Sequence, residues 1–142
     1  MKKLAIIAAV GLMTSTAFAQ KVQEKDVPAN AKNTLLKAYP NAKEVKWDKE
    51  GNNYEAGFDL NKVDYSVLFD EQGNITETEI EIGLNELPQK AKDYIAQNYK
   101  GLSTKEAAKI TDAKGTITFE AELKGKDLIF DTEGNFLKEI KN

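Results

Sequence analysis

Apolar and polar residues alternate one by one in several stretches of the chain. A period of two is typical of strands in an antiparallel sheet that has one buried and one polar face. The clearest alternation spans residues 54–60, 63–69 and 117–123. Further strands are expected at residues 45–47, 75–82, 108–110 and 136–140.

Two other segments place apolar residues four positions apart, which puts them on one face of a helix. These residues are Ala31, Leu35 and Tyr39 in the first segment and Ala91, Ile95 and Tyr99 in the second. Pro28 and Pro88 precede them, where the first turn of a helix tolerates proline. Pro40 and Gly101 follow, and both residue types end helices.

The same order of motifs occurs twice. Val27-Pro28 with Ala31-Lys32 recurs as Leu87-Pro88 with Ala91-Lys92. Further matches, in the same order, are Tyr54-Glu55-Ala56 with Phe119-Glu120-Ala121, and Phe69-Asp70…Gly73-Asn74 with Phe130-Asp131…Gly134-Asn135. Three ordered matches indicate a duplicated unit of one helix followed by about four strands.

We therefore predict an α+β fold, a tandem repeat of a helix plus about four antiparallel strands, with both helices on one face of a continuous curved sheet. We expect both repeats to form one compact domain. The predicted boundaries are a signal peptide at 1–19, an N-terminal lead at 20–26, repeats at 27–82 and 87–142, and a linker at 83–86.

The first residues have the features of a secretory signal peptide. Lys2 and Lys3 precede an apolar stretch that is too short to span a bilayer, and Ala17-Phe18-Ala19 supplies small residues before a cleavage point at Gln20. We expect a periplasmic or secreted protein that does not insert into a membrane after the signal is removed. The chain has no Cys, so the fold must hold without disulfides.

Charge and residue types narrow the range of functions. The chain has 23 acidic and 20 basic side chains, and loss of Lys2 and Lys3 would make it more acidic, which disfavours nucleic acid as a partner. It contains no His and no Cys, so catalytic triads and the usual zinc, copper and haem ligand sets cannot form. We predict no cofactor, no metal and no enzymatic activity.

The repeated unit resembles the PepSY-like proteins, which are small exported proteins common in gut Bacteroidetes. The residues that carry the resemblance are the apolar-Pro pair, the helix ending in Tyr, Tyr54-Glu55-Ala56 and the Phe-Asp-x-x-Gly-Asn segment, best matched from Phe130 to Leu137. The resemblance covers nearly the whole predicted mature chain. It implies a fold similar to the β-lactamase inhibitor protein and a role in binding or inhibiting another protein. It implies no catalytic residues.

Acidic residues on the polar strand face are the candidate binding site. They are Glu55, Asp59, Glu77, Glu79, Glu120 and Glu122, and we expect them to face water. This face either keeps the protein soluble and blocks edge pairing or docks a basic protein or peptide. A pair of catalytic carboxylates at Glu55 and Glu120 is an alternative, but an open sheet offers little burial to shift a pKa.

Two local patterns also have two interpretations. The segments starting at Asp70 and Asp131 contain some of the oxygen ligands of a calcium loop, but hairpin turns explain the same residues. Trp47 is either a core residue or an exposed binding residue, and its alternation with Val45 favours the core.

The function expected from the sequence is an exported protein-binding module, which would act as an inhibitor if the implied likeness extends to function. The alternative is a periplasmic carrier of a small ligand or cation. A third class, an enzyme that uses carboxylates alone, would require a deep cleft with two acids.

Overall fold

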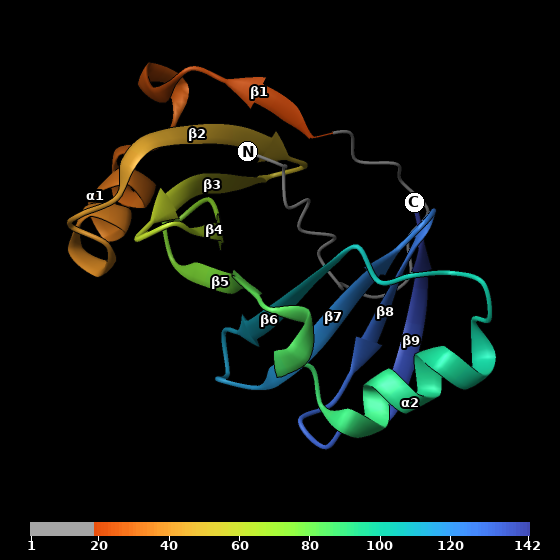
Figure 1. Cartoon of the computed structure of the whole chain (residues 1–142). Coiled ribbons are helices and arrows are strands. Elements are labelled where there is room, and N and C mark those ends of the chain that lie inside the picture. The colour runs from red at the N-terminus through yellow and green to blue at the C-terminus, as the bar shows by residue number, and fades with distance from the viewer. Residues whose placement is uncertain (1–18) are drawn as a thin grey trace. The chain divides into compact units, whose positions relative to one another are not determined.

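The computed structural model describes residues 19–142, so the signal peptide predicted for residues 1–19 lies almost entirely outside the described residues. Within this range, two α-helices and nine strands form two tandem units, the first ending at Glu79 and the second running from Ile80 to Asn142 (Figure 1). The predicted α+β class and tandem repeat are therefore confirmed. Over the described range, helices are too short or too polar to cross a membrane.

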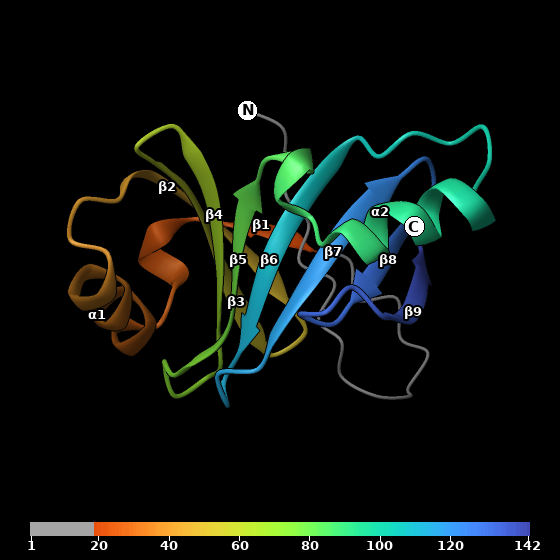
Figure 2. The same cartoon turned by 60° about the horizontal axis from the view of Figure 1, so that its bottom comes forward.

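The first unit contains one helix and a run of antiparallel strands (Figures 1 and 2). Its elements are β1 (Gln20–Val22), the 3-10 helix η1 (Glu24–Asp26), α1 (Ala29–Ala38), β2 (Lys43–Glu50), β3 (Asn53–Leu60), β4 (Val63–Phe69) and β5 (Ile75–Ile82), whose last residues belong to the second unit. The sequence did not predict β1, because three residues are too few to show alternation.

The second unit repeats this order. Its elements are the 3-10 helix η2 (Leu84–Glu86), α2 (Gln89–Asn98), β6 (Glu106–Asp112), β7 (Ile117–Leu123), β8 (Lys126–Phe130) and β9 (Phe136–Lys141). Strands β6 to β9 pair antiparallel in chain order. The sequence did not identify β8, because its three apolar residues are consecutive rather than alternating.

In the first unit, α1 packs on the apolar face of the strands. Ala31 and Leu35 are buried against a strand layer that includes Trp47, Phe58 and Phe69. Burying one large apolar side chain contributes about 1.5–3 kcal/mol, so this layer is the main source of stability. Trp47 is 5 % exposed and its ring lies 5.7 Å from that of Phe69, which confirms its prediction as a core residue.

The tyrosine that follows each helix is used differently in the two units. In the first unit Tyr39 contacts two rings, Phe58 at 5.1 Å and Tyr65 at 5.7 Å between centroids. In the second unit the hydroxyl of Tyr99 donates a hydrogen bond of 2.7 Å to Glu139. Burial and this hydrogen bond raise the pKa of Tyr99 to about 12, and the bond lowers the pKa of Glu139.

The Phe-Asp-x-x-Gly-Asn segments form turns closed by their own aspartates. The carboxylate of Asp70 accepts hydrogen bonds from the backbone N–H groups of Gln72 (3.0 Å) and Asn74 (2.8 Å). Asp131 makes the equivalent bonds. The side-chain amides of Asn74 and Asn135 also donate to these carboxylates, and together with the backbone bonds they hold the pKa of both aspartates below the ordinary value. The hairpin-turn interpretation is therefore confirmed.

The glycine of each turn touches the first turn of the helix in its own unit. A Cβ at Gly73 would lie 2.6 Å from the backbone of Asn30, and one at Gly134 would lie 2.8 Å from the amide nitrogen of Ala91. Both glycines have positive φ, a conformation that side chains disfavour. Each turn therefore needs glycine for backbone conformation and for contact with the helix.

We predict that Gly134→Ala lowers the free energy of unfolding by about 1–3 kcal/mol more than Gly115→Ala, because only Gly134 is overpacked against a helix. Gly115 is a matched control: its φ is +82° against +86° at Gly134, and nothing lies within 4 Å of its added Cβ. Urea denaturation followed by circular dichroism measures both losses. Equal losses would show that the turn does not support α2.

Candidate functional site

The strand face opposite α1 carries most of the polar residues of the first unit. The register places Lys21, Asp48 and Glu55 side by side on β1, β2 and β3. A second row contains Lys46, Gly57 and Ser66, and a third pairs Asp59 with Asp64. Residues paired across neighbouring strands share a face, so all three rows point away from α1.

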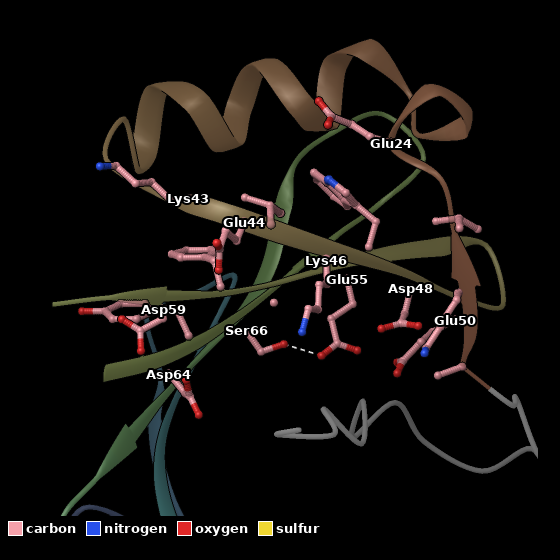
Figure 3. A pocket seen from close by; sticks show the side chains of 18 residues that line it. Glu24, Lys43, Glu44, Lys46, Asp48, Glu50, Glu55, Asp59, Asp64 and Ser66 are labelled. Atoms are coloured by element: carbon pink, nitrogen blue, oxygen red, sulfur yellow. Dashed lines mark hydrogen bonds between the residues drawn. The ribbon is translucent and has the colours of Figure 1, made fainter. Parts of the chain in front are cut away.

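A pocket of about 590 Å³ opens at this part of the first unit (Figure 3). Residues of β1 to β4 line it, and its lining has seven acidic side chains against three lysines. The acids that carry the argument below are Asp48, Glu50, Glu55, Asp59 and Asp64. Trp47, Phe58 and Tyr65 also border the pocket, but the side chains of Trp47 and Phe58 are buried in the core under α1.

Glu55 and Ser66 form a buried polar pair at the pocket. The hydroxyl of Ser66 donates a short hydrogen bond to the Glu55 carboxylate (Figure 3). Glu55 is 6 % exposed and Ser66 is 1 % exposed. Because a buried carboxylate is unfavourable without hydrogen bonds, Ser66 stabilises the position of Glu55. Gly57 lies opposite Ser66 and leaves room above the pair, since it has no side chain.

The side chain of Glu50 interacts with that of Glu55. Burial, a hydrogen bond with the Glu55 side chain, and the negative charges of Glu55, Asp48 and Glu77 raise the pKa of Glu50 to about 8. Two neighbouring carboxyl groups that cannot both ionise share a proton. In the folded chain Glu50 therefore keeps a proton at neutral pH that the unfolded chain has released, and its contribution to stability falls as pH rises from about 4.5 to about 8.

The second unit has acidic residues at the positions that correspond to Gly57 and Ser66. The register pairs Glu122 with Asp127, where the first unit pairs Gly57 with Ser66, and Glu106 lies on the other side of Glu122. Burial raises the pKa of Asp127 against the opposing effect of a hydrogen bond with Asn142. Lys105 lies 3.9 Å from Glu122.

The structure corrects the expected exposure of the acidic face. We expected all six predicted binding residues to face water, but Glu55, Glu79 and Glu120 are buried, with 6 %, 1 % and 7 % exposure. Asp59 is exposed, and Glu77 and Glu122 are partly exposed. The expectation failed because alternation identifies the face of a strand that a residue occupies, but not what covers that face.

The pocket contains only part of the predicted set. Glu55 and Asp59 line it, and Glu77 acts on Glu50 through its charge. Asp48, Glu50, Asp64 and Ser66 were not predicted as site residues. The sequence pattern could have identified Asp48 and Glu50, because they continue the polar positions that alternate with Trp47. They were missed because the strand was expected to end earlier. Across residues 19–142, no group of three or more acidic side chains is arranged to hold a metal ion.

A comparison with protein families identifies the chain by its sequence. The model of the family described as "Putative beta-lactamase-inhibitor-like, PepSY-like" matches residues 13–77 and again residues 58–138. The chain belongs to the PepSY-like family. The two matches confirm the resemblance inferred from the repeated motifs and the tandem character of the chain. No curated protein matches it.

Solved structures of proteins from several Bacteroides species have a similar fold. A DUF2874 family protein from Bacteroides uniformis is 22 % identical, with a TM-score of 0.71 over 80 % of this chain and 88 % of that one. A protein from Bacteroides eggerthii, described among "putative periplasmic proteins", is 17 % identical, with a TM-score of 0.73 over 81 % and 88 %. A BLIP-like protein from Bacteroides fragilis is 24 % identical, with a TM-score of 0.65 over 80 % and 85 %.

We predict that Ser66→Ala lowers the free energy of unfolding by about 1–3 kcal/mol, because it leaves the buried Glu55 carboxylate without its hydroxyl donor. Ser103→Ala is the control, since Ser103 is exposed and its loss should change stability by less than about 0.5 kcal/mol. Urea denaturation at constant pH measures both. Similar values for the two variants would contradict a stabilising role for the Ser66–Glu55 bond.

Proposed function

We propose that this PepSY-like protein is an exported binding module whose acidic pocket in the first unit receives a lysine or arginine side chain of a partner protein. The observation that supports this proposal is the composition of the pocket. Its volume is about 590 Å³, and seven acidic residues and three lysines line it. A basic side chain complements this charge excess.

Burial makes the pocket selective for cations. A carboxylate held in a partly dry site interacts with an ammonium or guanidinium group more strongly than an exposed one does. Glu55 is already fixed by Ser66, so a partner does not need to order it, which reduces the entropic cost of binding. The pocket lysines, Lys21, Lys43 and Lys46, are exposed and can move aside.

Family and location support a protein as the partner. The family description contains the words "beta-lactamase-inhibitor-like", and the Bacteroides fragilis relative is described as BLIP-like. We extend this to the present chain as a role in binding another protein, with inhibition as one consequence. The signal peptide expected at residues 1–19 and the periplasmic description of the Bacteroides eggerthii relative favour a partner in the cell envelope.

The test must avoid unfolding the chain. Charge reversal at Glu79 or Glu120 would bury a lysine, so Asp59 and Asp64 are better targets because they are exposed and partly exposed. They face each other across β3 and β4, so replacing both with Asn removes a like-charge pair. Asn also preserves the acceptor that binds the N–H group of Lys62 at position 59.

We predict that the double variant Asp59→Asn, Asp64→Asn weakens partner capture about tenfold or more, because pairing with a buried cation is lost. The control is Glu71→Gln with Asp93→Asn, which removes two charges from exposed positions outside the pocket. Capture from the native envelope is quantified by mass spectrometry.

Zero-length carbodiimide crosslinking then identifies the contact, since it joins a pocket carboxylate to a partner lysine.

A crosslink from Asp48, Glu55, Asp59 or Asp64 to a partner lysine would support the proposal. A partner that crosslinks only outside the pocket and whose capture Asp59→Asn, Asp64→Asn leaves unchanged, or a partner that the control variant loses equally, would contradict it.

A second candidate is a carrier of a small organic cation, and the pocket volume favours it because small-molecule sites span about 300–1,000 Å³. In that case putrescine, lysine or arginine should raise the melting temperature of the free protein, and Ca²⁺ serves as an inorganic comparison. A thermal shift with these amines that is lost in Asp59→Asn, Asp64→Asn would favour the carrier. An unchanged melting temperature across the series would count against it.

A further inference from the structure

Strand β1 brings the predicted cleavage point next to Glu50. The register pairs Gln20 with Lys49, Lys21 with Asp48 and Val22 with Trp47. Continued by one step, the same register places Ala19 opposite Glu50, and both residues line the pocket. Figure 3 shows Asp48 and Glu50 beside β1. Opposed residues in an antiparallel pair have Cα atoms about 4.5–5.5 Å apart.

Cleavage between Ala19 and Gln20 would create an amino terminus at this position. The peptide nitrogen of Gln20 would become an ammonium group, whose ordinary pKa is about 7.7–8.0. We propose that signal-peptide removal places the new α-ammonium group of Gln20 beside the Glu50 carboxyl, where it forms an ion pair that changes the charge of the pocket. The proposal concerns only this chain and requires no partner.

The surroundings of Glu50 favour a cation there. The groups that face it are Asp48 on its own strand, Glu55 on β3 and Glu77 on β5, all of which act on it as negative charges. Two lysines are also close in the register: Lys21, opposite Asp48, and Lys49, which pairs with Gln20 and whose ammonium group lies over the Tyr54 ring. A cation at Gln20 would be attracted by three carboxylates and a fourth at Glu50 itself, so the amine should stay protonated above its ordinary pKa.

The effect on Glu50 has a definite sign. Before cleavage, burial and its acidic neighbours hold the pKa of Glu50 at about 8. An opposite charge within about 4–6 Å lowers the pKa of a carboxyl group by roughly 1–3 units. Glu50 would therefore ionise at neutral pH in the cleaved chain, and the pocket would gain an internal ion pair in place of a shared proton.

Because residue 20 is glutamine, the cleaved chain can also exist with an uncharged amino terminus, which serves as a comparison for the charged one. The α-amino nitrogen of an N-terminal glutamine can attack its own side-chain carbonyl carbon. A new C–N bond then forms, the side-chain nitrogen leaves as ammonia, and the product is an uncharged lactam. Gln20 is exposed, so its side chain is free to cyclise. The cyclised chain would lose the cation while keeping β1.

The experiment compares chains that begin at residue 20 with a charged or a neutral terminus. The charged form carries Gln20→Ala, which cannot cyclise, and the neutral forms are the same chain with an acetylated amine and the cyclised wild-type chain. Carbon-detected NMR of ¹³C-labelled glutamate follows the Glu50 carboxyl through a pH titration. We predict that the pKa of Glu50 is lower by about one unit or more in the charged form.

Stability provides a second measurement. In the neutral forms the free energy of unfolding should fall as pH rises from about 4.5 to about 8, because only the folded chain retains the Glu50 proton. The charged form should show a smaller fall. Glu50→Gln should abolish the difference between the forms, whereas Glu71→Gln, at an exposed turn residue, should preserve it.

Three results would overturn the proposal. The first is the same Glu50 titration in charged and neutral forms. The second is a difference in stability that persists in Glu50→Gln. The third is an amino terminus other than residue 20 in the exported protein, as determined by intact mass. None of these measurements involves a partner, so their failure would leave the proposed binding function untouched.

Discussion

The contact between the start of each helix and the glycine of the following Phe-Asp-x-x-Gly-Asn turn determines the arrangement of the unit. At Gly73 and Gly134 the chain approaches the helix backbone more closely than any side chain allows. The aspartate of the turn holds this geometry by binding two backbone N–H groups. The helix is thereby fixed over one strand face, which becomes the core, and the opposite face receives the carboxylates.

The two faces of the first unit therefore have different energetic constraints. The face under α1 is stabilised by apolar burial around Trp47 and Phe69. The other face buries Glu55, and burial of a carboxylate is unfavourable unless hydrogen bonds or a proton compensate. Ser66 supplies a hydrogen bond and Glu50 supplies a shared proton. This compensation depends on the charges around the two carboxyl groups.

The helices, most of the strands and the core could be predicted from the sequence because they follow from local spacing. Ala31, Leu35 and Trp47 are buried as predicted, since their period matches the element they occupy. The burial of Glu55 could not be predicted, because it depends on neighbouring strands. Strand β1 lies beside Asp48 through a register of three residues, and three residues carry no periodic signal. Asp48 and Glu50 were missed for the related reason that β2 is longer than its alternation suggested.

The two units differ at the positions beside the pocket of the first unit. The pair Gly57–Ser66 on β3 and β4 corresponds to Glu122–Asp127 on β7 and β8. Gly57 adds no side-chain volume and Ser66 adds only a hydroxyl, so the carboxylate of Glu55 borders open space. At the same place the second unit has two acids, one of them buried, so both side chains there are larger and carry carboxyl groups. The first unit therefore has two small residues, Gly57 and Ser66, beside its acidic pocket. The second unit has two carboxyl side chains at the same positions.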